Sequence, residues 1–172
     1  NIDFFNSNII NIEKLTWRLK KIEIFSETLN KEKLINFETG KDQLFSIIRN
    51  YKLFRLLEKD LSKNKYFKSI FINEKNLSFL KKYELIINCD TSNIISKRYF
   101  SKKIIKKYNS YAHTTIISHD QILNNTACQI FTKKGPLAFL PISSKETSIV
   151  YSVHSFKNQK EENIEKLIKN KN

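Results

Sequence analysis

The chain has only two glycines, Gly40 and Gly135, two prolines and no methionine. It therefore holds no GxGxxG turn, in which glycines let a dinucleotide pyrophosphate approach a helix N-terminus. The two cysteines, Cys89 and Cys128, are too few for a disulfide framework or a cysteine metal cluster, and the three histidines never cluster in sequence. We therefore assign no metal ligands. Because the sequence begins at Asn1 and lacks methionine, we expect it to be a segment of a longer chain.

Long apolar runs are also missing, since none approaches the roughly 20 residues that a membrane-spanning helix requires. No signal peptide is visible, and we expect a cytoplasmic protein. Arginine is scarce as well: the chain has 27 lysines but only four arginines, although its formal net charge is +14. Phosphate contacts favour arginine forks, so lysine spread over the whole chain points to biased coding. We therefore expect no nucleic-acid partner.

What the sequence does contain is a hairpin signal at residues 135–153. A fully apolar run, Leu137 to Ile142, is followed by the polar residues Ser143 to Glu146 and then by a β-branched run, Thr147 to Val153. Such runs suit two antiparallel strands. Pro141 has no N–H for a ladder, so we expect it at an edge, beside a bulge or beside a ligand.

Other elements follow from the spacing of apolar residues. Ile9 to Leu19 predicts a short helix, and Leu53, Leu56, Leu57 and Leu61 predict a helix over 50–61 with Asn50 as its N-cap. Strands are expected at 21–25, 35–38, 67–72 and 83–88, then at 108–118, 126–132, 137–142 and 147–153, with the last four in an antiparallel meander. The strand at 83–88 ends before Asp90, which would face a ligand crevice. We expect 97–107 to be a basic surface loop or helix, and 157–172 an amphipathic helix.

Three stretches carry a family resemblance. GPLAFLP, preceded by Ala127 to Phe131 and followed by Ser148 to Val153, resembles the substrate-domain sheet of the flavin-dependent hydroxylases of ubiquinone biosynthesis. These are relatives of p-hydroxybenzoate hydroxylase. Ile48 to Leu53 is similar to the family's VENRxL helix start, where an arginine contacts the flavin dinucleotide; Asn50 fits this motif and Tyr51 stands at the arginine.

The third stretch, Leu85 to Arg98, is similar to the family's LLVGADGxNSxVR segment. Its Asp-Gly motif lies where the flavin pyrophosphate or ribose approaches. Asp90, Asn93 and Arg98 match this motif, and Lys97 is the other candidate for its basic residue. Thr91 replaces the motif glycine, which predicts an altered site because glycine alone tolerates positive φ freely.

The resemblance implies an α+β fragment of a p-hydroxybenzoate hydroxylase-like FAD-binding fold, with an antiparallel substrate-domain sheet and part of the α/β FAD domain. The implied organisation is a helical segment at 1–20, paired strands of the substrate domain at 21–47, part of the FAD-binding domain at 48–100, the antiparallel substrate-binding sheet at 101–155 and a truncated amphipathic helix at 156–172.

The activity implied is FAD-dependent hydroxylation of an aromatic ring, with O₂ and with NAD(P)H or another electron donor. No side chain of this segment is assigned a catalytic role. The residues placed at the substrate by resemblance are Ala138, Leu140, Pro141 and Ile142, whose apolar character suits a prenylated phenol. Peripheral association with the inner membrane and membership of a ubiquinone-biosynthesis complex are further expectations.

Two alternatives stay open. One is a non-catalytic basic α+β binding module for RNA or an anionic surface, which the high lysine content allows. The other is a decayed flavoprotein paralogue, which Tyr51 and Thr91 bring into consideration because both depart from the family motifs.

Overall fold

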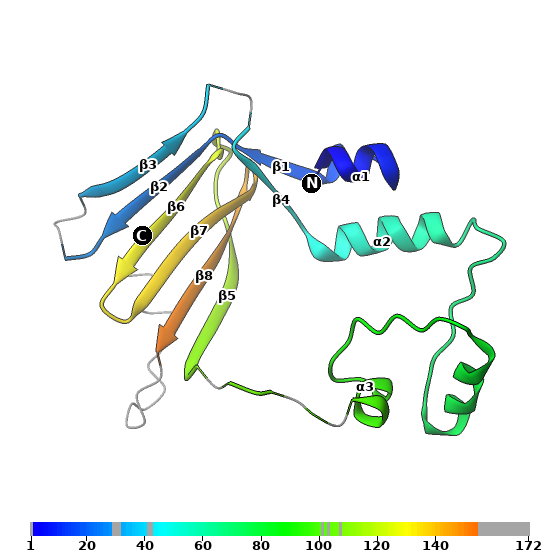
Figure 1. Ribbon diagram of the computed structural model, residues 1–172. Helices are drawn as coiled ribbons and strands as arrows, with labels where there is room; N and C mark the ends of the chain where they lie inside the picture. Colours follow the sequence, from blue (N-terminus) through cyan, green and yellow to red (C-terminus); the bar gives the residue numbers. More distant parts are fainter. Residues whose placement is uncertain are drawn as a thin grey trace. The chain divides into compact units, whose positions relative to one another are not determined.

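Figure 1 shows the chain as a computed structural model, which describes residues 2–28, 32–40, 43–100, 102, 104–106 and 108–154. The predicted α+β class is confirmed, because the described chain combines helices with a six-stranded and a two-stranded sheet. It divides into two units: residues 60–108 form the second, and the rest forms the first. No helix in the described ranges is long and apolar enough to cross a bilayer. The helix predicted at 157–172 lies outside the described residues.

A mixed six-stranded sheet is the main structure of the first unit. In spatial order its strands are β3 (Lys33–Glu38), β2 (Lys21–Ser26), β6 (Thr126–Thr132), β7 (Gly135–Ser143), β8 (Glu146–His154) and β5 (Ser110–Ser118) (Figure 1). The predicted strand positions at 21–25 and 35–38 and from 108 to 153 are confirmed. Strands β2 and β6 run parallel, with Lys21 opposite Thr126, and all other neighbours are antiparallel. The parallel pairing was not predicted.

The order of the four late strands corrects the predicted meander. Strand β5 pairs with β8, not with β6, so β5 to β8 form a Greek-key arrangement. The connection from β5 to β6 crosses the end of the β7–β8 hairpin. There the backbone N–H of His119 donates to Lys145 O, and that of Ile122 donates to Ser144 O. These two hydrogen bonds hold the connection across the end of the hairpin. The pattern of strands in the sequence does not predict them.

The predicted β7–β8 hairpin is confirmed, with a tight turn at Ser144 and Lys145. Its register shifts between Pro141 and Ser143, which puts the proline beside a bulge as expected. At the other end of β7, Gly135 has a φ of +143°, and a Cβ there would lie 2.0 Å from Ser152 O. Only glycine fits at this close approach of two backbones.

The two faces of the sheet differ in burial. On the packed face, Leu137, Ile149 and Tyr151 form a buried cluster with Phe139 beside it. The opposite face, which we call the open face, is made of the alternate residues, which apart from Ser26 and Ala127 are partly buried or exposed. The register places on it Ile22, Ile24, Ala138, Leu140, Val150 and Ile116.

The N-terminal region is not the helix that the sequence predicted at 9–19. Its elements are α1 (Ile2–Asn8), a 3₁₀ turn η1 (Glu13–Leu15) and β1 (Thr16–Leu19), which pairs with β4 (Phe45–Ile48) in a two-stranded antiparallel sheet. Leu15, Trp17 and Leu19 alternate, and this period of two is the pattern that the backbone follows. Leu19 is fully buried, and the Trp17 indole N–H donates to Asn124 O. Tertiary contacts thus favour a strand here.

Helix α2 (Asn50–Leu61) has the predicted bounds. Its first hydrogen bonds run from the N–H groups of Lys52 and Leu53 to Arg49 O. Because the N-cap residue is the one whose carbonyl accepts the first helical bond, Arg49 occupies that position and Asn50 is the first helical residue. The prediction of Asn50 as N-cap is therefore wrong by one residue.

The second unit contains the 3₁₀ helix η2 (Glu74–Lys82) and helix α3 (Ile94–Tyr99). The strands predicted at 67–72 and 83–88 do not form, and the described residues of this unit contain no strand at all. A strand needs a partner for its backbone groups, and none is present among them. Leu85 and Ile87 consequently expose about three quarters of their surface, 75% and 78%.

Candidate functional site

The Asp90 turn is the first part of the candidate site, and it lies in the second unit. The Asp90 carboxylate accepts hydrogen bonds from the backbone N–H of Ser92 at 2.8 Å and from its hydroxyl at 2.7 Å. This is an Asx turn, in which an aspartate side chain orders the backbone two residues on. Asn93 then caps α3 by accepting from the Ser96 N–H at 2.8 Å. Asp90 and Asn93 are therefore brought together by local hydrogen bonds.

Asn88 and Ser96 stabilise this turn through side-chain hydrogen bonds. The Asn88 side-chain amide donates to the Ser96 hydroxyl at 2.6 Å and to Asp90 O at 3.0 Å, while its carbonyl accepts from the Asn93 amide at 2.7 Å. Ser96 is buried, with 3% of its surface exposed, and its hydroxyl donates to Asp90 O. Sequence reasoning singled out neither residue, although Asn93 followed three positions later by Ser96 is a weak N-cap signal.

Thr91 stands where the family motif has glycine, and the turn forms around it. Asn109 is the one non-glycine residue with positive φ in the part of the chain that the structure describes. Thr91 thus adopts an ordinary backbone conformation that a β-branched residue tolerates. The turn forms without a glycine at this position. The Thr91 side chain nevertheless leaves a ligand less space beside the backbone than a glycine would.

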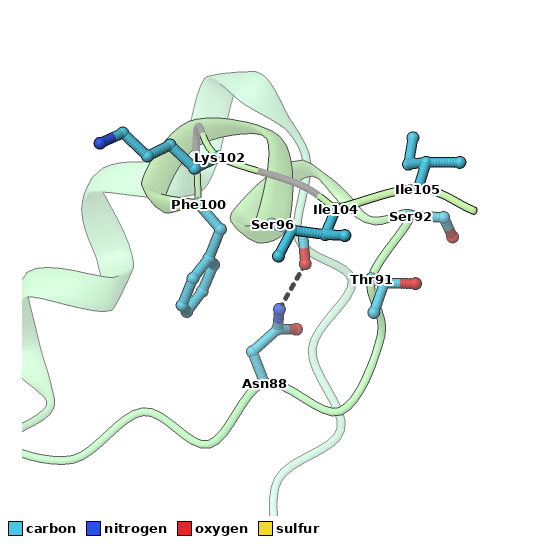
Figure 2. A pocket seen from close by; sticks show the side chains of 8 residues that line it. All are labelled: Asn88, Thr91, Ser92, Ser96, Phe100, Lys102, Ile104 and Ile105. Atoms are coloured by element: carbon cyan, nitrogen blue, oxygen red, sulfur yellow. Dashed lines mark hydrogen bonds between the residues drawn. The ribbon is translucent and has the colours of Figure 1, made fainter.

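A wide pocket of about 630 Å³ opens beside the turn (Figure 2). Its lining combines hydroxyl and amide side chains with apolar ones and one cation; the lining residues are Asn88, Thr91, Ser92, Ser96, Phe100, Lys102, Ile104 and Ile105. Its volume falls within the usual range of about 300–1,000 Å³ for ligand sites. Hydroxyl and amide groups beside an ammonium suit the ribose and phosphate oxygens of a nucleotide. The residues thus fit the polar part of a flavin dinucleotide.

Arg98 and Lys97, the two candidates for the basic residue of the motif, lie in the last turn of α3 and are both exposed. Neither lines the pocket. The cation that does so is Lys102, which the resemblance did not single out. A lysine at this position could reach an anionic group as a mobile point charge.

Asn50 and Tyr51, the other predicted cofactor residues, belong to the first unit and are exposed at the start of α2. The Arg55 guanidinium lies 5.9 Å from the Tyr51 ring centroid, which is a cation–π distance. Arg55 therefore places a positive charge beside Tyr51, one helical turn along α2.

Arg49, immediately before α2, makes the main ion pair of this region. Its guanidinium binds the Glu146 carboxylate at the β7–β8 turn. The hydrogen bond from Arg49 is the main cause that holds the pKa of Glu146 below its usual value, and the same bond raises the pKa of Arg49. The pair ties the start of α2 to the hairpin.

The residues predicted to line the substrate are divided between the two faces of the sheet. Ala138 and Leu140 lie on the open face, opposite Val150 and Ser148 respectively. Pro141 lies on the packed face and is almost fully buried, and Ile142 occupies the bulge. Only Ala138 and Leu140 are therefore placed to contact a ligand on the open face.

A polar cluster beside the hairpin was not expected from the sequence. The Asn124 side-chain amide donates to Ser143 O at 2.8 Å, to Glu146 O at 3.2 Å and to the Thr147 hydroxyl at 3.0 Å. His119 Nε2 lies 3.1 Å from the same hydroxyl. These contacts satisfy buried polar groups and fix the β5–β6 connection. No group of three or more His, Cys, Asp or Glu side chains that could hold a metal occurs within the described ranges.

Comparison with known proteins adds no family: no protein-family model and no curated protein matches the chain.

Proposed function

We propose that the chain is part of an FAD-dependent aromatic-ring hydroxylase of ubiquinone biosynthesis. In this proposal the open face of the six-stranded sheet covers a prenylated phenol, and the Asp90 turn with its pocket holds part of the flavin dinucleotide. The fold would then be a fragment of the p-hydroxybenzoate hydroxylase type. A complex with other enzymes of the pathway belongs to the same proposal.

The observation that carries the proposal is the apolar character of the open face. Ile22 and Ile24 on β2, and Leu140 and Val150 on the adjacent strands β7 and β8, are all only partly buried. Between these two groups β6 contributes Ala127, Gln129 and Phe131 to the same face. The exposed side chains of Ile116 on β5 and Phe37 on β3 extend this surface to both outer strands. A contiguous apolar patch on a sheet usually marks a ligand or partner site.

The residues of this face would bind and orient the substrate without reacting. Leu140 and Ala138 would contact the prenyl chain, where each buried methylene contributes about 0.8 kcal/mol. The same apolar surface would exclude water from the ring. When bound, reduced flavin supplies activated oxygen from O₂, with electrons from NAD(P)H or another donor.

The cofactor part of the proposal rests on the Asp90 turn. Asp90, Asn93 and the pocket residues Thr91, Ser92 and Lys102 lie in one short stretch of the second unit. The pocket offers hydroxyl and amide groups for ribose and phosphate oxygens. Arg98, Asn50 and Tyr51 remain candidates from the family resemblance.

The decisive experiment is the visible absorption spectrum of the protein purified from its complete coding sequence. We expect bound flavin. Asp90→Asn should keep the Asx turn, because an asparagine carbonyl also accepts from Ser92, but it removes the charge. Flavin binding should then weaken about tenfold to a hundredfold, the effect of losing a charged hydrogen bond. The matched control is Asp60→Asn, which alters an exposed aspartate paired with Lys63 and should leave flavin binding unchanged.

A folded protein that shows no flavin and takes up none from excess FAD would contradict the proposal. It would favour a non-catalytic binding module or a decayed paralogue. Equal flavin loss in Asp90→Asn and Asp60→Asn would remove the Asp90 turn from the cofactor site.

A further inference from the structure

The segment at residues 97–108 combines positive charge with apolar side chains. It contains six basic residues and no acid, interspersed with two isoleucines and three aromatic residues. The structure describes residues 97–100, 102, 104–106 and 108 of this segment, all in the second unit. Residues 61–72 of the same unit also lack an acid and contain two isoleucines and three aromatic residues, but they carry only three lysines, so 97–108 has twice their positive charge.

The apolar side chains of the segment are offered to solvent. Ile104 is fully exposed, Ile105 exposes 76% of its surface and Tyr108 72%. Tyr99 and Phe100 are also more than half exposed. Figure 2 shows the Ile105 side chain extending away from the ribbon. Two adjacent isoleucines at this exposure, flanked by aromatic residues, form an apolar patch without cover from the described part of the second unit.

Cations flank this patch in the sequence. Lys97, Arg98, Lys102 and Lys106 are exposed, and none of them forms an ion pair with a described carboxylate. Lys106 Nζ lies 5.2 Å from the Tyr108 ring centroid. The positive charge is therefore available to an external anionic partner.

We propose that the described residues of this segment, 97–100, 102, 104–106 and 108, form a docking surface for an anionic lipid bilayer. Stable attachment to a membrane takes two signals, and this segment supplies both: lysines for the acidic headgroups and Ile104 with Ile105 for the acyl region. Tyrosine is enriched at the boundary between headgroups and acyl chains, and phenylalanine is common on the apolar face of segments that lie in this interface.

Charge and side-chain type favour lipid over nucleic acid. The two most exposed apolar residues of the segment, Ile104 and Ile105, have no π-face on which a base could stack. Five of the six basic residues are lysine, whereas specific phosphate recognition favours the planar fork of arginine. Diffuse attraction to a charged bilayer needs only positive charge.

The test is co-sedimentation of the full-length protein with vesicles of phosphatidylcholine alone and of phosphatidylcholine mixed with phosphatidylglycerol. We expect binding only to the mixed vesicles and weaker binding as salt is raised. The double variants Ile104→Ser/Ile105→Ser and Lys102→Ser/Lys106→Ser should each weaken binding about tenfold or more. Sedimentation reports vesicle binding and not flavin content or activity, so failure of this inference can be told apart from failure of the proposed function, even though Lys102, Ile104 and Ile105 also line the pocket.

The matched control is Ile122→Ser/Leu123→Ser in the β5–β6 connection. This pair is also adjacent and exposed, at 55% and 85%, but it is flanked by Asp120, Gln121 and Asn124 instead of lysines. Its removal should leave vesicle binding unchanged. The proposal is overturned by absence of binding to mixed vesicles, by equal loss in the control, or by tighter binding to a single-stranded RNA oligonucleotide than to the vesicles at the same salt.

Discussion

Gly135 is the residue on which the β7–β8 hairpin depends most, because its φ of +143° and the nearby Ser152 carbonyl leave no room for a side chain. Gly135→Ala should lower the free energy of unfolding by roughly 1–3 kcal/mol or more, the usual cost of a strained backbone residue. Urea denaturation followed by circular dichroism measures this. Gly40→Ala is the control, since a Cβ there meets nothing within 4 Å. Equal stability of the two variants would contradict the role assigned to Gly135.

Glu146 links acid stability to the pair with Arg49. Its pKa is lower in the folded chain than in the unfolded chain, chiefly because of the hydrogen bond from Arg49. The pair therefore stabilises the fold at neutral pH, and this contribution is lost as the pH falls through the folded-state pKa. Glu146→Gln should lower Tm at pH 7, and its difference from the wild type should begin to shrink as the pH falls below about 4.3 and should vanish below the lower, folded-state pKa.

The control for this measurement is Glu13→Gln. Glu13 pairs with Arg18 at 3.4 Å, and both side chains are about half exposed, 51% and 50%. Exposed pairs contribute little to stability. A Tm difference for Glu13→Gln as large and as pH-dependent as that for Glu146→Gln would show that the Arg49 pair has no special role.

At the scale of the element, strand β7 separates structural residues from residues available to a ligand. Leu140→Asp on the open face should raise the KM for a prenylated phenol about tenfold, because a carboxylate replaces an apolar contact. Steady-state kinetics of the full-length enzyme checks this. Leu34→Asp introduces the same change on β3, where Leu34 is already 45% exposed, and should leave KM unaltered. An unchanged KM for Leu140→Asp would remove the open face from the substrate site.

The elements that sequence predicted well are those whose pattern matches their environment. Helix α2 forms where leucines recur at helical spacing, and Leu53, Leu56 and Leu57 are partly buried while most of its other residues are exposed. The β7–β8 hairpin has a clear turn between two apolar runs. Leu85 to Ile87 has an equally strong strand pattern, but the described second unit offers no strand to pair with it. Pattern alone therefore predicts a propensity, while pairing depends on neighbours.

The candidate site was predictable only where its geometry is local. Asp90 and Asn93 are three positions apart, so a turn that leads into a helix brings them together. The Arg49–Glu146 pair and the contact of Trp17 with Asn124 join residues about a hundred positions apart, and no local pattern announces them. The division of Ala138 and Pro141 between opposite faces follows from alternation, once the strand is known.

At the scale of the whole molecule, one sheet joins strands from the beginning and the end of the described chain. Only the parallel pairing of β2 with β6 connects the β2–β3 pair to the late strands. Sequence patterns located all of these strands but did not show that they share a sheet. The residue pattern of a β-strand does not identify the strand with which it pairs. The lysine-rich composition did not predict the strand order either, since net charge affects solubility and binding partners and not topology.

That parallel pairing also dictates when the protein can acquire its native shape. Lys21 finds its partner in Thr126, so during translation β2 and β3 must wait at the ribosome until roughly a hundred further residues have been made. A waiting two-stranded ribbon is only marginally stable in water. Maturation should thus be slow and governed by contact order, and chaperone protection should matter most while β2 and β3 have been made and β6 has not.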